Sequence, residues 1–194
     1  MLILCLCLIV ALILEDQLIK LYIVNNIREC TGFIDRYYTF RIGNFDIFSI
    51  THIRNDGAGF SILEGKTAFL LVFTFIVMAG ITAYICWKRK SLHRIEMLCL
   101  SMIVAGGIGN FIDRVRMVIE PNFNGVIDYI KLEFISFPIF NFADICVCVG
   151  AFGYCIYVIV AEIKQQKLKN AQKVSETEKS SETADNTESE NEQI

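Results

Sequence analysis

Residues 68–87 read Ala68-Phe-Leu-Leu-Val-Phe-Thr-Phe-Ile-Val-Met-Ala-Gly-Ile-Thr-Ala-Tyr-Ile-Cys-Trp87, a run of twenty residues without a charged side chain. At about 1.5 Å per residue, a helix of this length crosses the ~30 Å hydrocarbon core of a bilayer. Three further apolar segments, residues 2–24, 97–112 and 145–161, have the same character. The sequence therefore predicts four transmembrane helices.

The segment of residues 2–24 could instead be a cleaved signal peptide. It has no basic residues before its apolar run and no small-residue cleavage site, and it carries Asp16 and Lys20. A secretory signal has a basic region before its apolar core, a small-residue cleavage site after it and no charges within it. We therefore expect residues 2–24 to be a permanent span.

The composition of the 194 residues agrees with a membrane protein, because 54% of them are hydrophobic and the mean hydropathy is +0.49. A soluble domain of this size needs more polar surface.

The net charge of −3 owes much to seven acidic residues between Glu176 and Glu192. Residues 164–194, basic and then acidic, are predicted to form a cytoplasmic disordered tail, because such a tract buries too little apolar area to order itself. The rest of the chain is mildly basic and gives no indication of nucleic-acid binding.

The basic residues predict how the chain crosses the membrane. They gather in the connection between the second and third segments and after the fourth: Lys88, Arg89, Lys90, His93, Arg94, Lys164, Lys167, Lys169 and Lys173. The positive-inside rule places both groups, and both termini, in the cytoplasm. The connections 25–67 and 114–137 then lie outside. The alternating stretches 38–42 and 45–50 predict short strands there. The expected fold is an all-α membrane protein, with four transmembrane helices and a small extracytoplasmic β-rich cap.

Polar residues gather at the predicted outer ends of the spans. Asp16 and Lys20 lie roughly 21 and 27 Å from the cytoplasmic end of the first span. The others are Asn110 and Asp113 at the end of the third, Asn141 and Asp144 at the start of the fourth, and Asn55 and Asp128 in the outer connections. Ionisable groups at membrane depth are costly and usually functional. This layer is the expected site.

Each polar residue also has a simpler interpretation. Asp16 and Lys20 could be only an i, i+4 ion pair, and Asn141 with Asp144 could be only a helix cap. Asp128 could occupy an exposed strand position. Asp113-Arg114 could be an interfacial anchor, and the glycines of 106–109 could serve only helix packing.

Five segments, in order, resemble the motifs of the lipoprotein signal peptidases (type II), the membrane aspartyl proteases of bacteria. They are Asp16-Gln-Leu-Ile-Lys20, Asn55-Asp-Gly-Ala-Gly-Phe-Ser61, Gly106-Gly-Ile-Gly-Asn-Phe-Ile-Asp-Arg114, Val126-Ile-Asp-Tyr129 and Phe140-Asn-Phe-Ala-Asp144. The resemblance covers about residues 1–163. It departs from the family pattern at Gly59, where alanine is usual, in the order of the small residues around Ile108, and at Tyr129, where phenylalanine is usual.

The resemblance implies that Asp128 and Asp144 are the catalytic pair. It implies that Asn55, Gly57, Asn110, Arg114, Asn141, Asp16 and Lys20 support the dyad or bind substrate, and that Asp113, Gly106 and Gly109 are structural. Two carboxylates in a low-dielectric site share one proton and can activate water without a metal or cofactor. The eight cysteines and two histidines form no recognisable metal or nucleophile motif, and the cysteines are expected to be apolar filler.

The family's activity would be removal of the signal peptide from diacylglyceryl-modified prolipoproteins, just before the lipid-modified cysteine, at the outer leaflet of the bacterial cytoplasmic membrane. The implied partners are lipid-modified prolipoprotein signal peptides, membrane lipids and globomycin-type peptide inhibitors, and a monomer would suffice. A small ion-coupled transporter and a structural scaffold are the alternatives. Transporters place their acids near the midplane and often contain internal repeats, whereas these polar residues lie at one edge.

Overall fold

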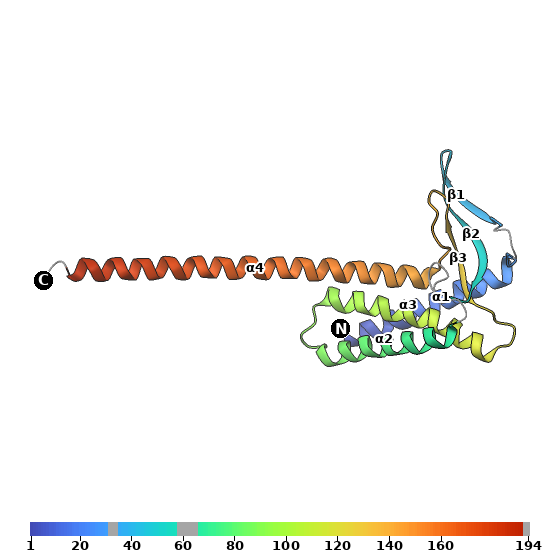
Figure 1. Cartoon of the computed structure of the whole chain (residues 1–194), viewed down its shortest axis with the longest axis horizontal. Helices are drawn as coiled ribbons and strands as arrows, with labels where there is room; N and C mark the ends of the chain where they lie inside the picture. The colour runs from blue at the N-terminus through green and yellow to red at the C-terminus, as the bar shows by residue number, and fades with distance from the viewer. Residues whose placement is uncertain (31–34, 58–65, 192–194) are drawn as a thin grey trace. The chain divides into compact units, whose positions relative to one another are not determined.

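The computed structural model describes residues 1–30, 35–57 and 66–191, with 171–191 described by backbone alone. Its long helices are α1 (Leu2–Asn26), α2 (Thr67–Lys88), α3 (Arg94–Ile119) and α4 (Phe142–Asn191) (Figure 1). Each contains a segment long and apolar enough to cross a membrane, which in α4 is Phe142–Asn170. The four predicted spans are confirmed.

Three strands form an antiparallel sheet in the order β1 (Tyr38–Ile42), β2 (Phe45–Asn55) and β3 (Val126–Leu132). Gly43, with a φ of 60°, forms the tight turn between β1 and β2. The two strands expected from the alternating pattern are confirmed, and β3 joins them from the connection before α4. The fold class is therefore the expected one, helices with a small sheet at one end (Figure 1).

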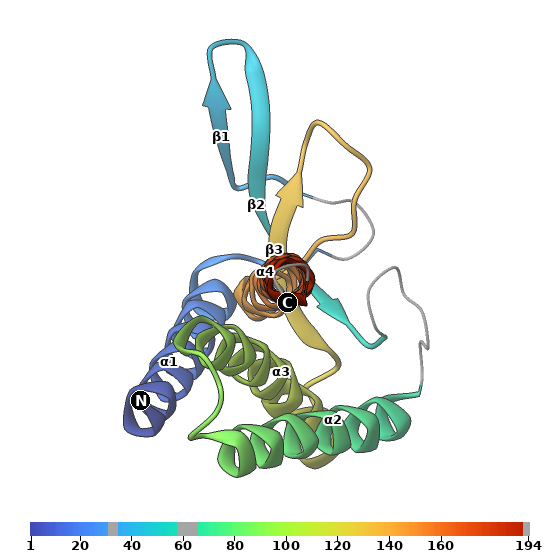
Figure 2. The same cartoon turned by 90° about the vertical axis from the view of Figure 1, so that its left-hand side faces the viewer.

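Helix α3 packs against both α1 and α2 (Figure 2). One apolar core joins Met97, Leu100 and Val104 of α3 to Cys5 of α1 and Ile85 of α2. A Cβ atom on Gly106 would collide with the backbone oxygen of Ala143, so α3 and the first turn of α4 approach at backbone distance. Small residues allow this approach in a membrane, where packing replaces the hydrophobic effect between helices.

The chain enters α4 through a short pairing with β3. Phe140 exchanges backbone hydrogen bonds with Ile130, at 2.8 and 3.0 Å. The next residue, Asn141, precedes the helix, so β3 and the start of α4 are held side by side. This pairing positions the site described below.

One predicted boundary differs from the structure. The outer connection predicted to begin at residue 114 begins at Glu120, because α3 continues to Ile119. Arg116 and Glu120 form an i, i+4 ion pair at 2.8 Å there, and Pro121 prevents a further turn.

The backbone of the predicted disordered tail is helical as far as Asn191. Residues 164–191 contain no glycine or proline and many lysines, glutamates and glutamines, which favour helix. The chain divides into the units Met1–Tyr154 and Cys155–Ile194, and every candidate site residue belongs to the first.

Candidate functional site

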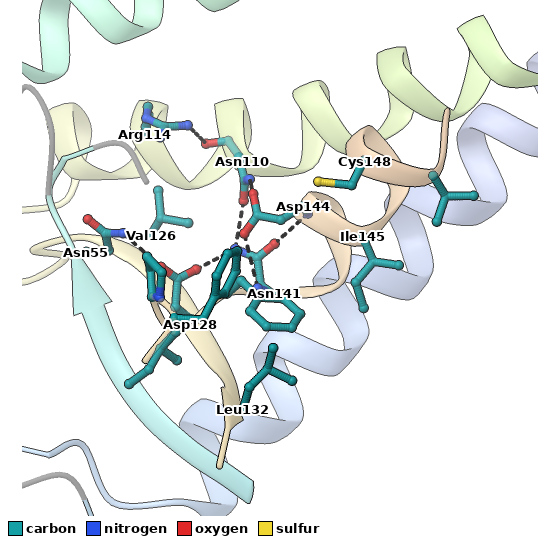
Figure 3. Close-up of a pocket in the computed structure, with 15 residues that line it drawn as sticks. Asn55, Asn110, Arg114, Val126, Asp128, Leu132, Asn141, Asp144, Ile145 and Cys148 are labelled. Atoms are coloured by element: carbon teal, nitrogen blue, oxygen red, sulfur yellow. Dashed lines mark hydrogen bonds between the residues drawn. The ribbon is translucent and has the colours of Figure 1, made fainter. Parts of the chain in front are cut away.

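Asp128 and Asp144 line the same cavity, which has a volume of about 380 Å³ (Figure 3). Asp128 lies in β3 and is only 3% exposed, so its interpretation as an exposed strand residue is wrong. Asp144 lies in the first turn of α4. Asn55, Asn110, Arg114 and Asn141 line the cavity beside them.

Asn141 bridges the two carboxyl groups. The side-chain oxygen of Asn141 accepts a hydrogen bond from the backbone N–H of Asp144, and the backbone N–H of Asn141 donates to Oδ2 of Asp144, both at 3.1 Å. This reciprocal pair is a capping box, so the expectation of a helix cap is confirmed. The Nδ2 of Asn141 also donates to Oδ1 of Asp128 at 2.6 Å. One residue therefore caps α4 and ties it to β3.

Asn55, the last residue of β2, holds the other side of Asp128. Its Nδ2 donates to Oδ2 of Asp128 at 2.9 Å, and its Oδ1 accepts from the backbone N–H of Gly57 at 3.0 Å. Arg114 donates to the backbone oxygens of Gly57 at 3.2 Å and Asn110 at 3.4 Å. Of the motif that begins at Asn55, residues 58–61 lie outside the described part of the chain.

Asn110 makes the corresponding contact with the second acid. Its Nδ2 donates to Oδ1 of Asp144 at 2.8 Å. Its Oδ1 accepts from Nδ2 of Asn141 and from Nζ of Lys20, both at 3.0 Å. The side chain of Asn110 therefore connects α1, α3 and the start of α4.

Behind this layer lies a buried ionic cluster. The ammonium group of Lys20 is 3.0 Å from Asp16 and 2.8 Å from Asp113, and all three side chains are at most 2% exposed. The i, i+4 pair in α1 is thus confirmed, but it shares its lysine with α3. The carboxylates also accept backbone N–H bonds, Asp16 from Ala143 at 3.1 Å and Asp113 from Ile127 at 3.4 Å.

Two glycines of α3 leave room for this arrangement. A Cβ atom on Gly109 would lie 2.6 Å from Oδ2 of Asp16. On Gly106 it would meet the backbone of α4, as described above. The structure thus brings the residues of the predicted site together. Six line the cavity, Gly57 is hydrogen-bonded to two of them, and the others lie in the ionic cluster or at the helix contacts behind it.

The environment of Asp128 favours its protonated form. Burial is the largest cause, and with the nearby charge of Asp144 it raises the pKa of Asp128 from 3.8 to about 7. Hydrogen bonds from Asn55 and Asn141, and the charge of Lys20, act in the opposite direction. A carboxyl group with such a pKa can give and take a proton near neutral pH.

The structure adds two features that sequence reasoning missed. The hydroxyl of Tyr129 accepts a hydrogen bond from the N–H of Phe142 at 3.1 Å, and burial raises the pKa of this phenol. The second is an apolar wall of the cavity, which is formed by Leu132, Phe137, Pro138 and Val149. Tyr129 could have been found as the aromatic next to Asp128, but residues 137–139 carry no motif that would reveal them.

The polar end of the cavity can position a reacting carbonyl and a water molecule, and its apolar end can accept a hydrocarbon group. Within the part of the chain that the structure describes, no group of three or more His, Cys, Asp or Glu residues is placed to share a metal ion. His52 is buried in the sheet, where its Nδ1 lies 2.8 Å from the backbone oxygen of Ile27.

The chain is similar to known proteins of one family. A family model described as signal peptidase (SPase) II matches residues 8–160. The lipoprotein signal peptidase of Lactiplantibacillus plantarum is 35% identical over 162 residues, which cover 84% of this chain and 95% of that protein. That of Enterococcus faecalis is 42% identical over 122 residues, covering 63% and 71%.

A solved structure described as "Bacterial membrane enzyme structure by the in meso method at 2.3 A resolution" has the same fold. It is 28% identical, with a TM-score of 0.65 over 84% of this chain and 88% of that one. The family expected from the five motifs is confirmed. The chain belongs to the signal peptidase II family of bacterial membrane proteases.

Proposed function

We propose that the chain is an aspartyl endopeptidase that removes the signal peptide from diacylglyceryl-modified prolipoproteins, cutting just before the lipid-modified cysteine. The observation that carries the proposal is that Asp128 and Asp144 open onto one cavity with Asn141 hydrogen-bonded to both. The relatives named above as lipoprotein signal peptidases support the substrate class.

Asp144 is the general base in this proposal. It accepts hydrogen bonds from Asn110 and from the backbone of Asn141, and it lies at the N-terminus of α4, where the helix dipole stabilises negative charge. Its carboxylate takes a proton from water, whose oxygen attacks the scissile carbonyl carbon. Asp128, whose raised pKa keeps it protonated near neutral pH, donates its proton to the carbonyl oxygen.

The tetrahedral intermediate then collapses. The carbonyl double bond re-forms as the C–N bond breaks, and the leaving amine takes the proton held by Asp144. The hydroxyl proton that came from Asp128 returns to Asp128. The dyad ends in its starting state, so water is the only co-reactant and no cofactor enters the reaction.

The supporting residues hold this geometry. Asn55 and Asn141 fix both oxygens of Asp128. Arg114 lines the cavity, and its guanidinium group donates hydrogen bonds to two backbone oxygens. We expect it to bind substrate as well. The ionic cluster of Lys20, Asp16 and Asp113 holds α1 and α3 behind the dyad.

The proposed location is the bacterial cytoplasmic membrane, with both termini inside and the site near the outer leaflet. The basic connection between α2 and α3 supports this orientation. A lipid anchored in that leaflet would enter the cavity from its apolar end, beside Leu132 and Val149. Globomycin-type peptides, which inhibit the family, are expected to compete for the same cavity. One chain supplies both acids, so a monomer suffices.

The test replaces each acid by its amide. Asp128→Asn and Asp144→Asn are expected to abolish cleavage of a lipid-modified precursor by purified enzyme, while both variants accumulate in the membrane. Asp46→Asn, which changes an exposed ion pair with Arg41 in the sheet, is the matched control and should cleave normally. Full cleavage by either dyad variant would remove Asp128 and Asp144 from the mechanism. A precursor without its lipid should be cut poorly by the unmodified enzyme.

A further inference from the structure

Asn55 is held in place from outside the cavity. It is the last residue of β2, where it pairs with Val126. From the end of the strand its side chain reaches Asp128 at hydrogen-bond distance, 2.9 Å. The connection between α3 and β3, which contains Phe123 and Gly125, contacts β2 at this point.

Gly125 lies directly on the backbone of β2. A Cβ atom at this position would be 2.6 Å from the backbone nitrogen of Asn55, 2.9 Å from its carbonyl carbon and 2.8 Å from the carbonyl carbon of Arg54. These are backbone atoms, which cannot turn aside as the end of a flexible side chain can. Glycine is therefore required at position 125 for Asn55 to lie where it does.

Phe123 fastens the same connection two residues earlier. Phe123 is 5% exposed and its ring contacts two guanidinium groups, with the Cζ atom of Arg54 4.4 Å and that of Arg116 4.0 Å from its centroid. Each arginine has an acidic partner, Glu29 at 3.3 Å and Glu120 at 2.8 Å. The ring thus links Arg54, the neighbour of Asn55, to the end of α3.

We propose that Phe123 and Gly125 form a brace that holds Asn55 against Asp128, and that they are positioning residues for the reaction although neither lines the cavity. The proposal rests on the dyad mechanism above, because it acts through the proton affinity of Asp128. No motif used to recognise the family includes either residue.

The consequence of loosening the brace follows from the direction of one hydrogen bond. Asn55 donates to a carboxylate oxygen, so it stabilises the ionised form of Asp128 and lowers its pKa. If Asn55 moves away, Asp128 keeps its proton to higher pH. Other groups that act on Asp128 are Asp144 of α4, Lys20 of α1, Arg114 of α3 and Tyr129, its neighbour in β3.

The experiment measures the pH profile of cleavage for Gly125→Ala and Phe123→Leu in the full-length enzyme. A second readout, infrared titration of the buried carboxyl group, is assigned with Asp128→Asn and reports on variants of low activity. Both substitutions should move the alkaline limb and the carboxyl titration upward, by about one pH unit for Gly125→Ala. In an Asn55→Ala background, Gly125→Ala should cause no further shift.

Each control variant makes the same kind of substitution, Gly to Ala or Phe to Leu, at a position away from the brace. Gly80→Ala places its new methyl group in open space on α2, and Phe152→Leu changes a ring on α4 that is 71% exposed. Neither should move the pH profile. A loss of activity that is equal at every pH would assign Phe123 and Gly125 a merely structural role.

An unmoved titration in both variants, or a Gly125→Ala shift that adds to that of Asn55→Ala, would overturn the brace. Asp128→Asn separates this failure from that of the mechanism. If Asp128→Asn is inactive while the titration is unmoved, only the brace fails. If Asp128→Asn cleaves normally, the proposed function itself fails.

Discussion

Asp128 illustrates how single residues in this protein are controlled by several neighbours at once. Its burial and the charge of Asp144 favour the proton, whereas Asn55, Asn141 and Lys20 favour ionisation. The balance leaves the pKa of Asp128 at about 7, close to neutral pH. A small change in any of these contacts is therefore expected to be visible in the pH dependence.

The first prediction concerns that pH dependence. Because the raised pKa keeps Asp128 protonated below about 7, the proposed general acid is present there and is lost as pH rises through 7. The value of kcat/KM for a lipid-modified substrate, which reports the free enzyme, should fall on the alkaline side of this value. A rate that stays constant well above about pH 8 would contradict Asp128 as the acid.

A second prediction concerns Lys20. Lys20→Met would leave Asp16 and Asp113 without their shared cation in a buried site, so the free energy of unfolding should fall by about 3–5 kcal/mol. Denaturant unfolding of the purified protein in detergent measures this loss. The matched control is Lys131→Met, which removes a partly exposed partner of Glu133 and should cost less than about 1 kcal/mol. Equal losses in the two variants would mean that the cluster is not stabilising.

At the scale of elements, the site depends on how closely α3 and α4 approach. Asn110 comes from α3 and Asp144 from α4, and their side chains meet at 2.8 Å. The backbone contact at Gly106 sets this separation. On the other side, the pairing of Phe140 with Ile130 and the hydroxyl of Tyr129 attach the start of α4 to β3.

Gly106→Ala tests this dependence. The new methyl group would force α3 away from the backbone of Ala143, at a cost of about 1–3 kcal/mol in stability. Cleavage should fall more than tenfold, by roughly the loss of one well-aligned hydrogen bond to a charged group. Gly80→Ala, whose methyl group meets no atom within 4 Å, should cleave at the normal rate. Normal cleavage by Gly106→Ala would show that the helices tolerate a wider separation.

At the scale of the whole molecule, the chain combines four spans with a sheet at one end of the helices. All candidate site residues belong to the unit Met1–Tyr154, and Asn55, Asp128 and the first turn of α4 meet where that sheet adjoins the helices. An even number of spans places both ends of the chain on the same side of the membrane. The proposed orientation then places the sheet and the cavity outside.

Reporter fusions at the C-terminus test this orientation. A fluorescent protein that matures only in the cytoplasm should fluoresce when fused after Ile194, whereas alkaline phosphatase, which is active only outside, should be inactive there. Alkaline phosphatase inserted in the β1–β2 turn after Gly43 should be active. The opposite pattern would invert the topology and place the cavity on the cytoplasmic side.

The sequence alone was enough to predict the four spans and the strands of the first connection, and to name a set of polar residues that the structure brings together. Long apolar runs, alternating stretches and local motifs are encoded in neighbouring residues, so they can be read without knowing the fold. The end of α3 was misplaced because the charged pair Asp113-Arg114 follows the uncharged run 97–112 and looks like a boundary, whereas Asp113 is buried against Lys20 and α3 continues to Ile119.

Only the tertiary structure decided which of these residues touch. It buried Asp128, made Lys20 the shared partner of Asp16 and Asp113, and gave Asn141 a contact with each acid. It also brought Gly125 against Asn55, a contact between residues seventy positions apart. Such contacts depend on strand register and helix separation, which arise from the packing of the whole chain and leave no local pattern in the sequence.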